Sequence, residues 1–561
     1  VQRGHHFRSQ TDTEVILHLY EEYGPECVQR LRGMFGFAIW DGPRRQLFLA
    51  RDRLGKKPLC YQQDAEAFRF ASEVKAILQD PAVSVRPDPA GIAQYLTYGY
   101  VPSPASAFQG VRRLPPAHYL ICRDGRVEIT RYWRLRRDRK EERPEAEWSE
   151  EIRARLEEAV RIRLISDVPL GAFPSGGIDS SAVVAMMSRL SGGSVKTFSI
   201  GFEEPEYDET RFAREAAERF GTEHHALVIR PDAIAILPKL AWHYDEPFAD
   251  SSAVPSYYVA QMTRQHVTVA LNGDGGDESF GGYDRYVAGN LAAAVDRLPG
   301  AGLLRGGIRR WLPFWPRGGR RTGLRSRGHR FLEGLAEAPE RRYARWLCHF
   351  TEDRKDALCT PEFRRAAGGA DDLEALLGVY RETDAPDFVD ATMGVDVALY
   401  LPDDLLVKVD IASMAHSLEA RSPFLDHEFM EFAATIPSSL KVQGRTTKYI
   451  LKRALRGVLP EEILRRPKKG FGVPIDHWLR HELRDLARET LLAPTCLDRG
   501  YFRREPLERM LEEHVRGTAN WDSLLWNLLM LEFWHRTYVD GEGTLAAQRR
   551  ALQPTAAPAT R

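Results

Sequence analysis

The pattern of hydrophobic and polar residues divides the chain into two parts with different rhythms. In the first part, residues 1–135, one helix is expected over Thr13–Tyr23 with Asp12 as its cap, because apolar residues recur there at helical spacing. Strands are predicted where short apolar runs are bounded by turn signals: Met34–Trp40, Gln46–Ala50 and Ala67–Ala71. The first part is therefore predicted to be an α+β domain or a sandwich.

From about residue 150 the pattern changes to an alternation of strands and helices. Strands are predicted at Leu170–Phe173, Thr197–Phe202, His225–Ile229 and Val267–Leu271. The helices predicted between them are Ile178–Leu190 and Glu209–Phe220. Repeated units of this kind predict an α/β fold with a parallel sheet and helices on both faces. After about residue 290 the pattern becomes mostly helical and rich in arginine.

Charge-dense and low-complexity stretches mark the expected boundaries. The polar run around residues 136–150 is predicted to be a linker between a first domain, 1–135, and a second domain, 151–540. The last residues, 541–561, are small, polar and Pro-containing, and are predicted to be a disordered tail. The sequence contains no evident internal repeat.

Composition excludes several classes of protein. The 561 residues are 43% hydrophobic and 28% charged with a formal net charge of zero, which is ordinary globular composition. The balance argues against a nucleic-acid-coating protein, and no apolar run approaches the roughly 18 residues of a membrane span. Six scattered cysteines favour a reducing compartment. We therefore expect a cytoplasmic protein with no nucleic-acid partner and no membrane partner.

The run Ser175–Ser181 (SGGIDSS) is the most informative segment. It follows a predicted strand directly and opens a predicted helix, so its two glycines can bring backbone N–H groups against a bound anion. This arrangement is typical of a loop that holds pyrophosphate or the phosphates of ATP. It is not a Walker loop, because no Gly-Lys-Ser/Thr closes it. The alternative is an ordinary turn with a helix cap.

A second Gly- and Asp-rich loop, Asn272–Glu278 (NGDGGDE), follows another predicted strand. The carboxyl ends of parallel strands lie at one edge of a sheet, so the two loops are expected to face each other. Carboxylates opposite a phosphate loop suit Mg²⁺, which prefers oxygen ligands and bridges phosphates. The alternative is a solvated acidic turn.

These two loops, with several further blocks, resemble the glutamine-dependent asparagine synthetases, including amidotransferase relatives associated with polysaccharide biosynthesis. The resemblance covers roughly residues 1–540. Its further blocks are Tyr207–Glu209, Asp245–Ser252, Tyr400–Asp426, Thr446–Leu455 and Arg465–Pro474, together with RLRGMFGFAIWD and ARDRLGKKPL in the first part. It implies an incomplete glutaminase domain of the N-terminal-nucleophile sandwich type, followed by a PP-loop synthetase domain.

The resemblance implies a reaction and roles for individual residues. ATP would activate the β-carboxylate of aspartate as an adenylate, and ammonia released from glutamine would then give asparagine, AMP and pyrophosphate. Asp179 and Asp277 match the acids that hold Mg²⁺. The residues matched to pyrophosphate and ATP binding are Ser175, Gly176, Gly177, Asp179, Ser180, Ile200, Asn272 and Gly273.

Further site residues follow from the same resemblance. Lys448 would offset negative charge as pyrophosphate leaves; the alternative is an exposed helical lysine. Asp274 stands where the family usually has Glu, a residue tied to formation of the intermediate. Pocket members are expected at Lys408, Asp410, Glu419 and Arg421, each of which could instead belong to a buried ion pair. A homodimer is one expectation for the assembly.

The family's glutaminase uses an N-terminal Cys, whereas position 1 here is Val. Asp12 matches the residue that binds the glutamine α-amine, its alternative role being a plain helix cap. We expect the sequence to be truncated upstream of Val1, because its strands would otherwise lose their neighbours. The rival hypothesis is a chain that depends on free ammonia.

Two further hypotheses remain open from the sequence. Another PP-loop amidotransferase could act on a different carboxylate, such as a sugar acid, and a degenerate paralogue could be a non-catalytic subunit. Residues 301–330 contain nine arginines interleaved with aromatic residues, which would suit nucleic acid or an anionic glycan. A solvated, Arg-rich helical segment is the favoured interpretation of that stretch.

Overall fold

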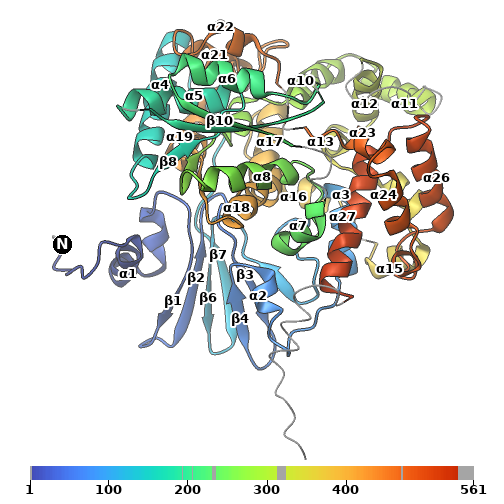
Figure 1. Ribbon diagram of the computed structural model, residues 1–561, viewed down its shortest axis with the longest axis horizontal. Helices are drawn as coiled ribbons and strands as arrows, with labels where there is room; N and C mark the ends of the chain where they lie inside the picture. Colours follow the sequence, from blue (N-terminus) through green and yellow to red (C-terminus); the bar gives the residue numbers. More distant parts are fainter. Residues whose placement is uncertain are drawn as a thin grey trace, which may run out of the picture.

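The computed structural model describes residues 3–192, 194–204, 206–229, 235–312, 324–369, 371–468, 470 and 472–540. The predicted tail at 541–561 lies outside the described residues. Figure 1 shows the strands of the first part below the parallel sheet of the second, with the C-terminal helices beside both. Among the described residues, no helix is both long enough and apolar enough to cross a membrane.

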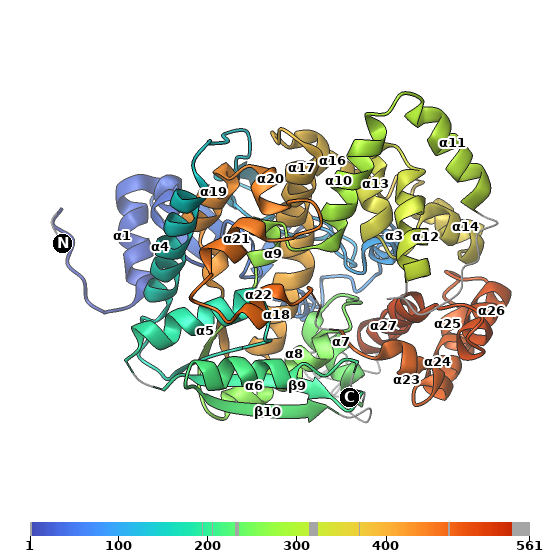
Figure 2. The same ribbon diagram turned by 90° about the horizontal axis from the view of Figure 1, so that it is seen from above.

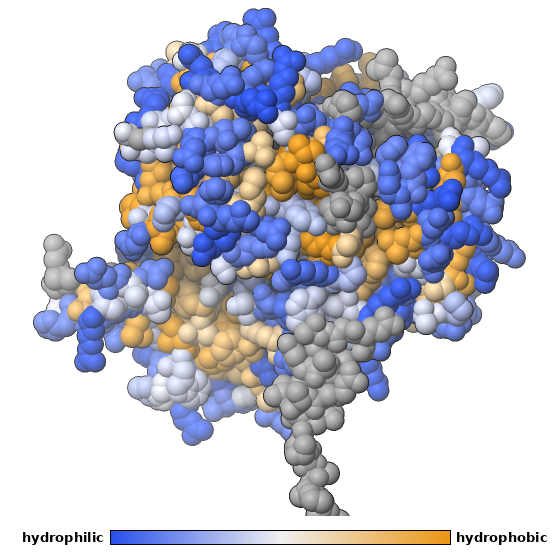
Figure 3. All heavy atoms as spheres, viewed as in Figure 1, coloured by the Kyte–Doolittle hydropathy of each residue, from blue (hydrophilic) through white to orange (hydrophobic). Residues whose placement is uncertain are grey.

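The first part contains one four-stranded and one three-stranded antiparallel sheet, with strand orders β1-β2-β6-β7 and β4-β3-β5. Its strands are β1 Gly36–Asp41, β2 Gln46–Arg51, β3 Cys60–Gln63, β4 Phe68–Ala71, β5 Val111–Arg113, β6 His118–Arg123 and β7 Arg126–Arg131. Its helices are α1 Asp12–Tyr23, η1 Gly24–Arg30, α2 Val74–Ile77 and α3 Pro89–Tyr98. The α+β prediction for this part is confirmed. Figure 3 shows apolar side chains gathered over the four-stranded sheet.

Two predictions at the edges of elements differ from the structure. Helix α1 begins at Asp12 with Thr11 as its N-cap, so Asp12 lies in the first turn and is not the cap. A carboxylate is favoured there too, because it faces the positive end of the helix dipole. Helix α4, Glu145–Arg163, begins inside the predicted linker, so only the first part of 136–150 lacks regular secondary structure.

The second part is built on a five-stranded sheet of order β10-β9-β8-β11-β12, in which every pairing is parallel. Its strands are β8 Leu170–Ala172, β9 Lys196–Phe202, β10 Glu223–Ile229, β11 Val269–Leu271 and β12 Glu419–Arg421. The helices that pack on it are α5 Ile178–Leu190, α6 Thr210–Arg219, α8 Ala253–Arg264 and α18 Leu406–Met414. Figures 1 and 2 place α5 and α6 on one face and α8 on the other. This confirms the predicted parallel sheet with helices on both faces.

The remaining chain is mostly helical, as predicted. The other helices are α7 Leu237–Tyr244, α9 Gly276–Phe280, α10 Asp284–Asp296, α11 Ala301–Trp311, α12 Leu324–Leu335, α13 Pro339–Leu347, α14 Glu352–Leu358, α15 Pro361–Ala366, α16 Glu374–Glu382, α17 Phe388–Val395, the π-helix η4 Asp396–Leu405, η5 Pro423–Leu425, α19 His427–Thr435, α20 Ser438–Lys441, α21 Tyr449–Ala454, α22 Glu461–Arg465, α23 Ile475–Arg480, α24 Arg484–Leu491, α25 Pro494–Leu497, α26 Arg504–Val515 and α27 Asp522–Tyr538.

The largest hydrophobic core joins the two parts. It contains α3 from the first part and α27 from the end of the chain. The ring of Phe108 lies 5.0 Å from that of Trp534 and 5.7 Å from that of Tyr538, and the Tyr95 hydroxyl donates to the Asn527 carbonyl at 2.7 Å. The first part is therefore held against the second by apolar packing as well as by the chain that connects them.

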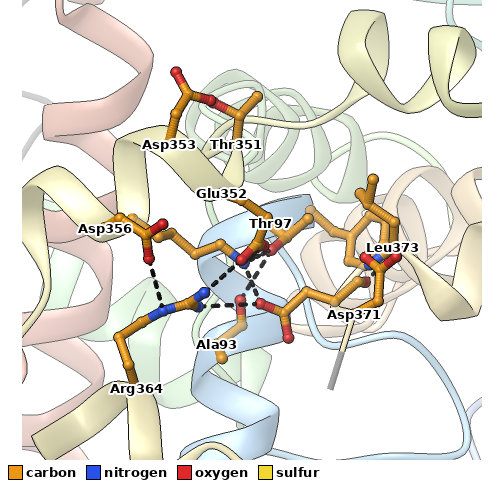
Figure 4. Close-up of polar contacts among 12 residues, drawn as sticks. Ala93, Thr97, Thr351, Glu352, Asp353, Asp356, Arg364, Asp371 and Leu373 are labelled. Carbon is orange, nitrogen blue, oxygen red and sulfur yellow. Dashed lines mark hydrogen bonds and ion pairs between the residues drawn. The ribbon is translucent and has the colours of Figure 1, made fainter. Parts of the chain in front are cut away.

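A buried polar cluster lies beside this core (Figure 4). The Lys355 ammonium, on α14, donates to Thr97 Oγ1 of α3 at 2.9 Å and pairs with Asp372 and with Glu352. Arg364 completes the cluster by pairing with Glu352 and, at 3.6 Å, with Asp372. Because Lys355 is fully buried, its charge depends on these partners.

Candidate active site

A large cavity lies where strands β8 and β11 end and beside β9, as expected for ligand sites in parallel sheets. Its volume is about 510 Å³. The SGGIDSS and NGDGGDE loops supply one wall, and α18 and the start of α21 supply others. Further lining residues are Ile463, Arg466, Pro467, Lys468, Gly470 and Gly472. Segments that are far apart in the sequence therefore meet at one place.

The first loop is shaped by hydrogen bonds between its own serines. Ser180 Oγ accepts from the Ser175 backbone N–H at 3.0 Å and lies 2.9 Å from Ser175 Oγ. Gly176 has a φ of +67°, and a Cβ there would come within 2.4 Å of Phe212 Cβ, so this position requires glycine. Gly177 then caps α5, whose N-terminal end faces the cavity. The loop thus offers backbone N–H groups and a helix dipole to an anion.

The second loop approaches the first so closely that two of its positions have no room for a side chain. A Cβ at Gly273 would lie 2.6 Å from the Ser180 backbone nitrogen, and one at Gly276 would lie 2.4 Å from the Asp179 carboxyl carbon. Just after α9, a Cβ at Gly282 would meet the Asp277 carboxylate at 1.8 Å. These glycines allow the acids of both loops to share one space.

Lys448 lies between the carboxylates of the two loops. Its ammonium pairs with Asp179 and, at 2.7 Å, with Asp277 Oδ1. Lys468 pairs with the other oxygen of Asp277 at 2.5 Å. The Lys448 backbone is left-handed, with φ +52°, at the N-cap of α21. This conformation is unusual for a residue with a side chain and is typical of functional positions. Lys448 is 5% exposed and is not the exposed helical lysine of the alternative reading.

The two lysines affect the pKa values of Asp277 and Asp179 to different extents. Burial alone would raise the pKa of Asp277, but Lys448 and Lys468 outweigh it and hold that pKa well below its usual range. Burial raises the pKa of Asp179, and the neighbouring Asp277 adds to this, although Lys448 opposes both. The pKa values of the two acids are therefore shifted in opposite directions, although both carboxylates pair with Lys448.

The other residues matched to nucleotide binding also face the cavity. Ile200 on β9 is buried in its wall, and Asn272 Oδ1 accepts from the Asp274 backbone N–H at 3.3 Å. Asp274 Oδ2 is buried and has no hydrogen-bond partner among the described residues. Burial raises the pKa of Asp274, against the opposing charges of Lys408 and Lys56. This carboxyl is thus placed to receive a donor from a ligand.

Of the four expected pocket members, one lines the cavity and three do not. Lys408 lines the cavity and pairs with Asp250 at 2.7 Å. Asp410 instead pairs with Lys57 of the first part at 2.6 Å and lines a smaller, second cavity between the two parts. Glu419 and Arg421 form β12, pair with each other at 2.6 Å and are not among the residues that line the main cavity. Glu419 and Arg421 therefore form an ion pair, which was the alternative to a place in the pocket.

Asp12 lies far from this cavity along the chain, exposed at the start of α1, with Thr13 Oγ1 at 3.5 Å. Sequence reasoning also missed several cavity residues, chiefly Lys468 and Arg466. Arg466 donates to the Ser175 carbonyl at 3.1 Å and lies over the Phe212 ring at 4.0 Å. Both residues fall in the block Arg465–Pro474, whose match to the family was the available signal.

Comparison with known proteins agrees with this geometry. The asparagine synthase family pattern matches residues 151–536, and that of the glutamine amidotransferase domain matches residues 1–133. The chain is 33% identical to asparagine synthetase [glutamine-hydrolyzing] 1 of Bacillus subtilis, over 96% of this chain and 83% of that protein. A putative asparagine synthetase of Mycobacterium bovis is 37% identical over 96% of this chain and 82% of its own length. Amidase chry2 of Gibberella zeae is 28% identical over 84% of this chain and 74% of its own.

The family pattern covers more than half of the chain, and the relatives align over nearly all of it. Both agree with a cavity whose acids and lysines converge at the ends of parallel strands. The chain belongs to the asparagine synthase family of glutamine-dependent ligases.

Proposed function

We propose that this chain amidates the β-carboxylate of aspartate, using ATP and ammonia. An oxygen of that carboxylate would bond to the α-phosphorus of ATP while the bond from this phosphorus toward the β-phosphate breaks, so that pyrophosphate leaves. Ammonia would then attack the acyl carbon and AMP would leave. In the full reaction the ammonia would come from glutamine, as the amidotransferase match suggests.

One observation carries the proposal: Lys448 is held between Asp179 and Asp277 beside a loop shaped for an anion. Pyrophosphate gains charge as it leaves, and a fixed ammonium stabilises that charge in the transition state. Lys468, on the other side of Asp277, adds a second cation for the same leaving group. A site for simple ATP binding would have no need for two lysines converging on the acids.

Asp179 and Asp277 would hold Mg²⁺. Both offer hard carboxylate oxygens, and Asp179 Oδ1 is buried with no hydrogen-bond partner among the described residues. When bound, Mg²⁺ neutralises phosphate charge and orients the leaving group. The chain's own residues would do the rest: Ser175 and Ser180 would bind the pyrophosphate, and Lys448 would turn from the carboxylates toward it.

The decisive measurement is exchange of labelled pyrophosphate into ATP, which reports adenylation without needing a nitrogen source. Aspartate should support exchange in the wild type, and Lys448→Ala should lower its rate by at least roughly a hundredfold. Lys196→Ala, on β9 and outside the cavity lining, is the matched control and should keep the wild-type rate. An unchanged rate in Lys448→Ala would remove the mechanism's central residue.

A second candidate substrate is another carboxylate, such as a sugar acid of polysaccharide biosynthesis. One relative of this chain is named an amidase, so proteins similar to it are not all named asparagine synthetases. The same exchange assay, run with a panel of carboxylates, separates the two candidates. Exchange that depends on a sugar acid and not on aspartate would replace the first proposal with the second. Ammonium chloride then tests amide formation independently of glutamine.

A further inference from the structure

Helix α11, Ala301–Trp311, presents most of its surface to solvent. Figure 2 shows it at the edge of the molecule, beside α10 and α12 and away from the parallel sheet. Ala301 is the only residue of the helix that is buried. Leu303 is 85% exposed, Trp311 72% and Leu304 47%. Such exposure of large apolar side chains within a single short helix is unusual for a surface helix, whose apolar face normally packs inward.

The exposed apolar residues share one face of the helix. Leu303, Gly307 and Trp311 follow one another at intervals of four residues, with Leu304 beside them. Arg309 lies on the opposite side, and Arg310 lies at the margin of the apolar face. The helix contacts the protein along a third strip that includes Ala301. The apolar face is thus directed outward and bordered by cations.

Helix α11 itself carries charge of one sign. Its charged residues are Arg305, Arg309 and Arg310, although the whole chain carries no net charge. Acids of neighbouring helices meet only part of this charge: Asp296 pairs with Arg305 at 2.7 Å, and Glu337 lies 4.0 Å from Arg309. An anionic partner would therefore be attracted to this edge of the molecule.

We propose that α11 docks on an anionic lipid bilayer, with Leu303, Leu304 and Trp311 at the boundary between headgroups and acyl chains. An arginine-bearing helix with an exposed Leu/Trp face is typical of helices that lie in the plane of a membrane surface. Its 11 residues are too few to span a bilayer, which takes about 20. A nucleic acid would use the arginines but has no need of the exposed leucines.

The test is flotation of the whole protein with vesicles in a density gradient. Vesicles of phosphatidylglycerol mixed with phosphatidylcholine should carry the protein upward at low salt, and vesicles of phosphatidylcholine alone should not. Leu303→Glu/Trp311→Glu should lower the bound fraction by roughly tenfold or more, because it places charge in the acyl boundary. Arg309→Gln/Arg310→Gln should lower affinity by about fivefold for each arginine.

Matched controls separate this surface from general effects. Ile165→Glu/Val168→Glu introduces the same two negative charges at positions that are 77% and 40% exposed in the loop after α4. Arg365→Gln/Arg516→Gln removes two exposed arginines elsewhere. Both should float like the wild type. All variants should keep aspartate-dependent pyrophosphate exchange, since none lies in the active-site cavity.

Three results would overturn the proposal. The first is no flotation of the wild type with anionic vesicles at low salt, and the second is equal flotation of Leu303→Glu/Trp311→Glu. The third is binding to single-stranded RNA that is tighter than vesicle binding and is lost only with the arginines. That outcome would assign the edge to nucleic acid. Selective loss of vesicle binding in both α11 variants would establish the bilayer contact.

Discussion

Glu278, beside the site acids, is a carboxyl that the fold keeps protonated at moderately acidic pH. Burial, strengthened by the charges of Asp277 and Asp396, raises the pKa of Glu278 from an ordinary 4.5 to about 7. The Tyr283 hydroxyl donates to it. A raised pKa means that the folded state retains a proton which the unfolded chain loses. Glu278 therefore favours the folded state most below pH 4.5, and this contribution is lost as the pH rises through 7.

We predict that Glu278→Gln has a more favourable effect on the free energy of unfolding, relative to wild type, at pH 8 than at pH 5. The amide keeps an oxygen to accept from Tyr283 but has no charge to bury, so the difference from wild type should grow by on the order of 3 kcal/mol between these values. Urea unfolding at both pH values measures it, with Glu489→Gln on the exposed side of α24 as the control. A difference that stays flat or shrinks with rising pH would contradict the assignment.

At the residue scale, the acids and glycines of the two loops could be predicted to form a site. Which residues from distant parts of the chain join them could not all be predicted. Asp179, Asp277 and Lys448 were predicted site residues, and the structure brings them together. Lys468 lies in a Pro-Lys-Lys-Gly run that is typical of a solvated loop. It pairs with Asp277 because this segment folds back over the cavity. Arg421 was expected in the pocket because its block matches one that lines the pocket in the family, yet in β12 its side chain shares a face with Glu419 and pairs with it.

At the scale of elements, the site depends on how closely the backbone approaches Asp277 and Lys448. We predict that Gly282→Ala lowers pyrophosphate exchange by about a hundredfold, because small displacements of catalytic groups have effects of that size. Its new Cβ would lie 1.8 Å from Asp277 Oδ1 and 2.4 Å from Lys448 Cε, so one of the two must move. Kinetics of exchange with aspartate provide the measurement.

The matched control for that substitution is Gly378→Ala on α16, where an added Cβ meets nothing within 4 Å. Alanine favours a helix over glycine by up to about 1 kcal/mol, so this variant should melt slightly higher and keep its exchange rate. Equal activity of the two variants would show that the close approach at Gly282 does not position the acids.

Elements with a local signal could be predicted, and those defined by distant pairing could not. Helix α5 has the predicted bounds, Ile178–Leu190, because its apolar spacing and its glycine entry are both local. Strand β12 was missed since Glu-Ala-Arg carries no strand preference. It is a strand only because β11, about 150 residues earlier, offers it an open edge to pair with in parallel.

At the scale of the whole molecule, the two parts share their stability. We predict that Lys355→Met lowers the free energy of unfolding by about 3 kcal/mol or more, because it leaves Asp372 buried without its main partner. Lys355→Met/Asp372→Leu should recover a large share of that loss, since both charges are then gone. Chemical denaturation followed by fluorescence and by circular dichroism gives both values.

An exposed pair nearby supplies the control. Arg365→Met breaks an ion pair with Glu362 on α15 whose side chains are both about 70% exposed, and it should change stability little. If Lys355→Met behaved like this control, the buried cluster would not be what holds α3 to α14. The shared core itself had no signal in the sequence, because hydrophobic periodicity shows which face of α3 is apolar and not which helix covers it.

The core that joins α3 to α27 also limits how such a protein can be recombined. A chimaera made by exchanging residues 1–135 with those of a relative at the polar stretch would separate Phe108 from the Trp534 and Tyr538 against which it packs. The graft would succeed only if the last helix came from the same parent as the first domain. The beginning of this chain therefore has to match its end as well as its middle, where Lys57 pairs with Asp410 and Thr97 accepts from Lys355.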